Sequence, residues 1–237
     1  MIERKGSRHI VKLAGEFLAI GAGVFLGLLA DDWRDLRNQR EAGLDALVLV
    51  REDLRSDSVE LATTRSALLT RSELTPWLIR NHRARETPDS AVIVLGSVLT
   101  LPRYQRIRPS YIALRETGRL DLIQNDAIRS EMVAYFERTQ EQFVQELSDW
   151  LRVRELLIAE LNEYWMISGS ETLQTVWPTP PDLTIGLDWP GVVGDRSVTM
   201  IATRYSGLGI VAAGRAESLI EVNSALATLI EDELNAR

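Results

Sequence analysis

The sequence predicts an all-α protein, with a single N-terminal transmembrane helix followed by a helical bundle of about four main helices. Three observations support this fold class. Residues 13–30 form an apolar segment whose only charged side chain is Glu16. Leucines then recur at intervals of seven, and from about residue 125 apolar residues recur at intervals of three and four. Such spacings are typical of a helix with one buried face.

The composition excludes several classes of function. The chain has 237 residues, of which 45% are hydrophobic and 26% charged, as expected for a folded protein. Its net charge of −7 argues against a nucleic-acid partner, which requires a basic face. Cysteine is absent and the only histidines are His9 and His82, so thiolate chemistry is excluded. We therefore expect neither a metal nor a cofactor.

The apolar segment at residues 13–30 is predicted to cross a membrane. Its helical length would be about 27 Å, close to the roughly 30 Å of a hydrocarbon core. Glu16 lies about one turn inside the segment, where it can pair with Lys12. We expect residues 1–12 to form a short cytoplasmic tail and residues 31–237 to form the helical domain.

Two other interpretations of this segment remain open. The basic residues before it and the sequence Leu28-Leu29-Ala30 are compatible with a cleaved signal peptide, although Glu16 and the length of the segment argue against one. The third interpretation is a buried helix of a soluble domain. It is opposed by the absence of a strongly amphipathic pattern.

Small residues recur every four positions in the segment, at Gly15, Ala19, Gly23 and Gly27. This spacing places them on one stripe of a helix, where a second helix can approach closely. We interpret the stripe as a helix–helix interface, and a chance arrangement of the glycines common in membrane helices is the alternative.

A long helix is predicted from about residue 33 to residue 80. Leucine recurs along it at Leu47, Leu54, Leu61 and Leu68. The positions four residues later are polar, namely Arg51, Ser58 and Arg65. A coiled-coil core would not contain those side chains, so we predict a narrow apolar stripe that packs on a neighbouring helix. Pro76 is expected to end or kink the helix.

Two shorter elements are expected next. Residues 91–101 are too few to span a bilayer and predict a buried helix, with a strand as the alternative because of their valines. Ser110 is expected to cap a short helix that closes at Gly118.

The second half of the chain predicts two long helices separated by a loop. The first extends from residue 121 or 125 to about 166, and the second covers about 197–234, with a break near Gly207 or Gly214 as an alternative. Between them, a proline-rich loop is predicted at about 168–195, because its many prolines and glycines disfavour a regular element.

The second helix is expected to bury a set of apolar residues that includes Leu219, Leu226, Ile230, Val211 and Leu229.

One cluster of residues suggests a binding site. Guanidiniums bind carboxylates and phosphates well, and the candidate ligand-binding residues are Arg106, Arg108, Tyr111 and Arg115. The same arginines could instead form salt bridges between helices or contact anionic lipid headgroups. The stretch GLGIVAAG at residues 207–214 lacks the preceding strand of a dinucleotide fingerprint, and we predict no catalytic residues.

Two stretches resemble an uncharacterised family of bacterial single-span membrane proteins, a domain of unknown function. EFLAIGAGVFLGLLADDWRDLRNQREAGLDAL resembles the family's apolar run and the charged helix after it, with Asp32-Trp33 in place of the more usual Asn-Trp. SYIALRETGRLDLIQNDAIRSEMVAYF resembles a second block that leads into a long helix. The resemblance implies a membrane anchor and an all-helical domain, and it supplies no catalytic residue.

These observations predict a non-enzymatic, membrane-anchored scaffold or accessory subunit. Its expected partners are the lipid bilayer and either further copies of itself or another membrane protein. The excess of basic residues before the apolar segment favours a cytoplasmic N-terminus, which places the helical domain in the periplasm of a bacterial inner membrane protein. The alternative is an extracytoplasmic sensor that binds an anion through the arginine cluster.

Overall fold

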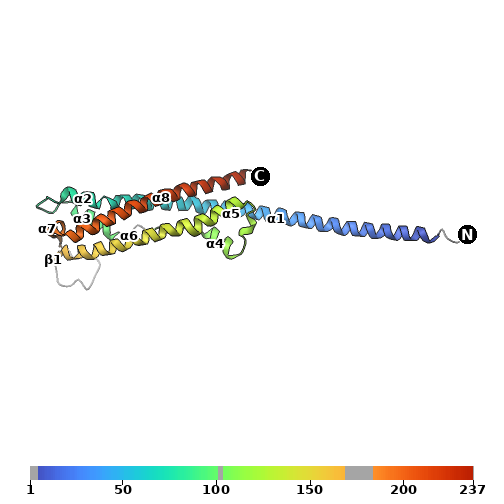
Figure 1. Ribbon diagram of the computed structural model, residues 1–237, viewed down its shortest axis with the longest axis horizontal. Coiled ribbons are helices and arrows are strands. Elements are labelled where there is room, and N and C mark those ends of the chain that lie inside the picture. The colour runs from blue at the N-terminus through green and yellow to red at the C-terminus, as the bar shows by residue number, and fades with distance from the viewer. Residues whose placement is uncertain (1–4, 101–103, 169–183, 237) are drawn as a thin grey trace.

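The protein is predominantly helical and is built around three long helical rods (Figure 1). The computed structural model describes residues 5–100, 104–168 and 184–236, and side chains from Phe25 onward within the first helix. The first rod is α1 (Lys5–Ser72), the second comprises α5 (Asp126–Val133), the π-helix η3 (Ala134–Thr139) and α6 (Gln140–Leu161), and the third is α8 (Arg196–Asn235). The predicted helical class is therefore confirmed as a predominantly helical fold, with three long rods and several short helices instead of about four main helices.

The rods pack side by side, with α8 antiparallel to the other two (Figure 1). α1 extends past α5 and past the end of α8, so the start of α1 lies far from the bundle while the end of α8 lies beside α1 (Figure 1). Every described residue from Phe25 to Ala42 is exposed, and burial begins at Gly43. We call residues 25–42 the stalk.

The buried face of α1 follows a heptad spacing. Its first set of positions is Leu47, Leu54, Leu61 and Leu68, each no more than 2% exposed. The partner positions lie three residues after each leucine, where Val50, Asp57 and Thr64 are also buried. The sequence analysis placed the partner positions four residues later, which was wrong, because Arg51, Ser58 and Arg65 are only half-buried at the edge of the interface. The correct positions continue the alternating three- and four-residue spacing of a helix-packing seam.

Short helices connect α1 to the second rod. They are α2 (Leu74–Asn81), α3 (Ala91–Gly96), η1 (Ser97–Leu99), α4 (Pro109–Glu116) and η2 (Leu120–Leu122). The predicted helix after residue 90 is present but shorter than expected, and Val92 and Ile93 are exposed instead of buried. α4 is followed by Gly118 with φ of +66°, a conformation that glycine adopts at low cost. The predicted cap at Ser110 was wrong, because Arg108 is the N-cap residue and Pro109 begins the helix.

Most of the described part of the predicted proline-rich loop is regular structure. β1 (Trp165–Ser168) pairs antiparallel with β2 (Thr184–Leu187), with Trp165 opposite Leu187. α7 (Trp189–Gly194) follows, begun by Pro190 and capped by Asp188, whose side chain accepts from the Gly191 amide. Proline is well tolerated in a first helical turn, which the sequence analysis did not take into account.

The last rod begins at Asp195, whose side chain accepts a hydrogen bond from the Ser197 amide. The helix continues through Gly207 and Gly214 without a break. Leu219, Leu226 and Ile230 are buried as predicted, whereas Val211 and Leu229 are exposed. α8 packs on α1 and α6, and its small residues Gly209, Ala212 and Ala216 permit the close approach.

Two adjacent hydrophobic cores share these rods. The core at the stalk end contains Leu47, Leu54, Tyr111, Phe136 and Leu226 among others, and the distal core contains Trp150, Trp189 and Tyr205. The distal core includes a stacked pair, Trp150 and Tyr205, with ring centroids 4.9 Å apart. Both cores lie beyond the stalk, so the stalk does not contribute to them.

No helix contains, within the described residues, a stretch both long and apolar enough to cross a membrane. The predicted span at residues 13–30 falls largely in the part of α1, residues 5–24, whose side chains lie outside the described set.

Gly43 is required by the close packing of α1 on η2. A Cβ at this position would lie 2.1 Å from the carbonyl oxygen of Leu122, which is backbone and cannot move freely. We expect Gly43→Ala to lower the free energy of unfolding by about 1–3 kcal/mol through overpacking. Gly207→Ala is the control: nothing lies within 4 Å of its Cβ position, so it should be neutral or stabilising by up to about 1 kcal/mol. Chemical denaturation followed by circular dichroism measures both, and equal effects would contradict the packing argument.

Candidate functional site

The arginine cluster predicted from the sequence lies between α4 and the second rod, and three of its members have partners there. Arg106 pairs with Glu141, and Arg115 Nη1 lies 2.6 Å from Glu137 Oε1. Arg108 Nη1 donates to the carbonyl oxygen of Phe136 at 2.8 Å. All three acceptors belong to η3 or to the first turn of α6. The cluster therefore fastens the segment before α4, and α4 itself, to the second rod.

Tyr111, the fourth predicted member, lies inside the core. It is 1% exposed, and its ring stacks on Phe136 with centroids 4.7 Å apart. Burial, together with a hydrogen bond to Glu137, raises the pKa of Tyr111 to about 12. Burial would raise the pKa of Glu137, but hydrogen bonds from Arg115 and Tyr111 outweigh it and the pKa is lowered. Ligand binding by this cluster stays a prediction.

A buried carboxylate, Asp57, connects the first two rods. Its side chain is 0% exposed and faces three side-chain donors and one amide. Oδ1 accepts from the Tyr104 hydroxyl at 2.9 Å and from the Ile107 amide at 3.4 Å. Oδ2 accepts from the Tyr135 hydroxyl and from Gln140 Nε2, the latter at 2.8 Å. A carboxylate offers about four acceptor positions, so Asp57 is saturated by the protein itself.

The π-helix explains how two of these donors reach the same carboxylate. Tyr135 and Gln140 are five residues apart, and in a regular α-helix they would differ in direction by about 140°. The wider turn of η3 (Ala134–Thr139) brings residues five apart onto one face. Tyr135 and Gln140 therefore both point at Asp57.

The third rod joins this network through Asn223, which is 2% exposed. Its Nδ2 donates to the Leu54 carbonyl and to the Tyr135 hydroxyl, both at 2.9 Å. Asp53, one turn before Asp57, accepts from the Ser110 amide at 2.7 Å and so satisfies a free donor at the start of α4. The polar network contains Asp53, Asp57, Tyr104, Tyr135, Gln140 and Asn223, and it links all three rods. Sequence reasoning missed it because it assigned the wrong partner positions to the leucine stripe.

The network also affects the pKa of its two tyrosines, Tyr104 and Tyr135. Burial raises the pKa of both Tyr104 and Tyr135 well above the usual range, and the negative charge of Asp57 raises them further. Their hydroxyls therefore remain donors to Asp57 at neutral pH. Such a saturated, buried carboxylate fixes the arrangement of the rods and has no free position for a substrate.

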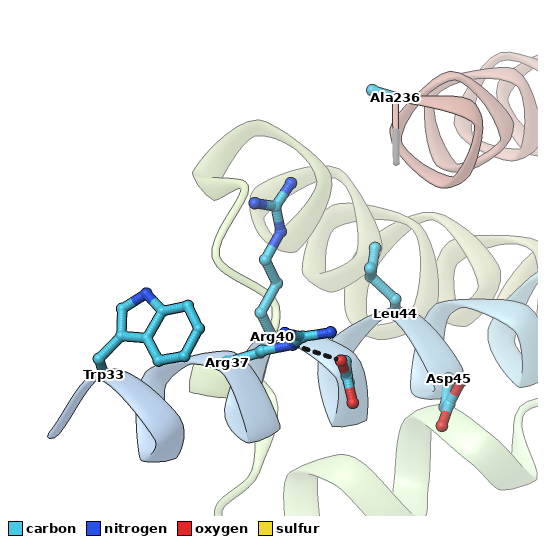
Figure 2. Close-up of a pocket in the computed structure, with 7 residues that line it drawn as sticks. Trp33, Arg37, Arg40, Leu44, Asp45 and Ala236 are labelled. Carbon is cyan, nitrogen blue, oxygen red and sulfur yellow. Dashed lines mark hydrogen bonds and ion pairs between the residues drawn. The ribbon is translucent and has the colours of Figure 1, made fainter. Parts of the chain in front are cut away.

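A second notable region is the stalk base, where α1 leaves the bundle (Figure 2). A cavity of about 750 Å³ lies there, and its lining consists of Trp33, Arg37, Arg40, Glu41, Leu44, Asp45 and Ala236. Arg37 Nε donates to Glu41 Oε1 at 3.1 Å, and its guanidinium lies 6.0 Å from the Trp33 ring centroid. Figure 2 shows Arg40 extending from α1 into the space between the stalk and Ala236 at the end of α8.

The lining of this cavity carries two arginines and two carboxylates, so it has no net preference for an anion. Within the described residues, no group of three or more histidine, aspartate or glutamate side chains is arranged to hold a metal ion. Among the apolar lining residues, Trp33 is 65% exposed and belongs to the stalk, whereas Leu44 is 9% exposed and belongs to the core. The stalk base is therefore a junction between an exposed apolar surface and a closed core.

The predicted small-residue stripe lies further along α1. The surroundings of Gly15, Ala19 and Gly23 on the helix surface lie outside the described set. Gly27 is described, and nothing lies within 4 Å of its Cβ position. Its face of the helix is thus open, and an interface through the stripe stays a prediction.

No family model, curated protein or solved structure matches this chain. The function is therefore argued from the geometry alone.

Removing the central carboxylate should destabilise the bundle strongly. Asp57→Ala leaves three buried side-chain donors without their acceptor, and each unsatisfied buried donor costs about 1–3 kcal/mol. We expect the free energy of unfolding to fall by about 3 kcal/mol or more, measured by chemical denaturation. Asp45→Ala, an exposed position on the same helix, should change it by less than about 0.5 kcal/mol. Similar effects of the two substitutions would contradict the structural role of the network.

The raised pKa values of the tyrosines predict that the folded protein loses stability at alkaline pH. All five have a raised pKa: burial is the main cause for four, and for Tyr164 a hydrogen bond to Asp195, which brings it to about 12. The unfolded chain loses these protons near pH 10, whereas the folded chain retains them. The contribution of the tyrosines to stability should thus be constant below pH 10 and be lost as the pH rises from 10 through 12.

Ultraviolet titration of tyrosinate and circular dichroism should change together above pH 10. A tyrosine that ionises at its ordinary value while the helical signal is unchanged would contradict this expectation.

Proposed function

We propose that the protein is a membrane-anchored, non-enzymatic scaffold, in which α1 is at once the anchor, the stalk and a core helix. The observation that carries this proposal is the continuity of α1 from Lys5 to Ser72. One unbroken helix contains the apolar segment, passes through the stalk and ends inside the bundle. Such a helix holds the bundle at a fixed distance and orientation from the bilayer, because a bend would require broken backbone hydrogen bonds.

The described end of the apolar segment supports the anchor. Phe25, Leu26, Leu28 and Leu29 are between 48% and 64% exposed, so the described part of the chain does not bury them. Apolar surface left in water costs roughly 25 cal/mol per Å², so these side chains require lipid or another apolar surface. Trp33 follows them after Asp31 and Asp32, as expected for an aromatic side chain at the membrane–water interface.

The assignment as a scaffold rests on how the buried polar groups are used. Asp53, Asp57, Gln140 and Asn223 all bond to the protein itself, and Asp57 lies where no solvent reaches it. The sensor alternative is less favoured, because Arg106, Arg108 and Arg115 already bond to the second rod. The proposed location is the bacterial inner membrane, with the N-terminus cytoplasmic and the bundle periplasmic. The excess of basic residues before the apolar segment supports this orientation.

Membrane anchoring is tested by fractionation of cells that express the full chain. Wild-type protein should remain in the membrane pellet after alkaline carbonate washing. Ile20→Arg should shift it to the soluble fraction, because an arginine in the centre of a membrane helix costs about 2.5–3.5 kcal/mol. Gln39→Arg, an exposed position in the stalk, is the matched control and should stay in the pellet. Wild-type protein in the soluble fraction would refute the anchor.

The proposed orientation needs a separate measurement. A reporter that is active only in the periplasm, fused after Arg237, should be active, and a reporter active only in the cytoplasm should not. The reverse result would leave the anchor intact and overturn the periplasmic placement.

A further inference from the structure

The heptad seam of α1 does not stop where the bundle stops. Counting back from Leu47 and Val50 by sevens passes Arg40 and Gly43 and then reaches a set of four apolar side chains. They are Leu26, Leu29, Trp33 and Leu36, which we call the stalk seam. Their exposed fractions are 64%, 48%, 65% and 58%. Within the bundle the same register packs against α8 and against second-rod residues such as Phe136, and in the stalk no described residue covers it.

We propose that the stalk seam is covered by the stalk seam of a second copy of this chain, in a parallel two-helix coiled coil. This inference rests on the proposed function, since a shared membrane holds both stalks parallel. The partner of the proposed scaffold is then a second copy of the same chain. The seam has the three- and four-residue spacing with which two α-helices interlock, and it continues the register that already packs helices in the bundle.

Charge complementarity favours a second copy in this orientation. With Leu26 and Trp33 as the first core positions, Asp32 and Arg37 occupy the two positions that flank the seam. In a parallel pair, Asp32 of one chain lies opposite Arg37 of the other, and the reciprocal pair forms on the other side. An antiparallel pair would instead place like residues opposite each other. The flanking charges therefore specify the parallel arrangement.

The structure also sets where the pairing ends. Arg40 takes the next core position, and Gly43 after it is packed on Leu122 of its own chain. From Leu44 onward the register is occupied by the chain's own helices, and α8 ends beside this point at Asn235. The two stalks must diverge at the stalk base, where the cavity of about 750 Å³ separates α1 from the end of α8. Pairing over so few turns is weak in solution, and a common membrane raises the effective concentration.

This stalk seam differs from the small-residue stripe predicted from the sequence. Gly27 belongs to that stripe but lies beside the core position Leu26 and outside the seam. An interface through the stripe and an interface through the seam would therefore place different residues against the partner helix.

Single-cysteine cross-linking tests the proposal directly, because the natural chain has no cysteine. In membranes that contain the full-length protein, Trp33→Cys and Leu36→Cys should form disulfide-linked dimers of twice the chain mass under mild oxidation. The matched controls are Asp35→Cys and Asn38→Cys, whose positions point away from the seam. Their dimer yield should be at least about fivefold lower than that of the seam variants. Gly27→Cys should also remain mostly monomeric.

Charge exchange provides the second measurement. In the Leu36→Cys background, Asp32→Arg should lower the dimer yield and Arg37→Asp should do the same, whereas the two together should restore it. Equal cross-linking at all positions, no dimer at Leu36→Cys, or a product with the mass of a different protein would each overturn the proposal.

The same membrane preparations test the dimer proposal and the anchor proposal independently. Protein that pellets with membranes but gives no seam-specific dimer would overturn the second-copy inference and leave the anchor intact. Soluble protein that gives the seam-specific dimer would refute the anchor and leave the pairing intact.

Discussion

The hydrogen bonds to Asp57 determine how the three rods of this protein fit together. A carboxylate in a leucine seam is expensive to bury, and it is stable here because four donors from two other parts of the chain converge on it. Those donors come from the segment before α4 and from the π-helix, and Asn223 of α8 is bonded to one of them. A shift of any rod along another would leave buried polar groups unpaired. The network therefore selects one register among the many that leucine packing alone would allow.

That fixed register matters because α1 leaves the bundle as a stalk. The orientation of the stalk relative to the bundle is set by the seam from Leu44 to Leu68 and by the tight contact of Gly43 with η2. A rigid junction transmits any constraint on the stalk, whether from a bilayer or from a second stalk, to the bundle behind it. In the proposed scaffold, the polar network and the anchor would together hold a helical surface at a defined place beside a membrane.

Much of the fold is predictable from the sequence because helices leave strong periodic signals. The leucines of α1 and the long second rod were accessible from spacing and residue type, and the structure confirms them. The helix α7 and strand β2 were missed, because proline and glycine were taken to exclude regular structure even though proline begins α7. The arginine cluster was recognised as a group, but its partners on η3 and α6 depend on which helix lies beside α4.

By itself, the sequence determined the helical class and the seven-residue leucine spacing of α1. These features follow from the local periodicity of one chain segment, which needs no knowledge of its neighbours. Only the tertiary structure decided that Asp57 and Thr64, not Ser58 and Arg65, take the core positions. The reason is physical: a buried carboxylate is acceptable only where Tyr104, Tyr135 and Gln140 can reach it, and these residues are brought together by a π-turn and by packing across about 80 residues of chain.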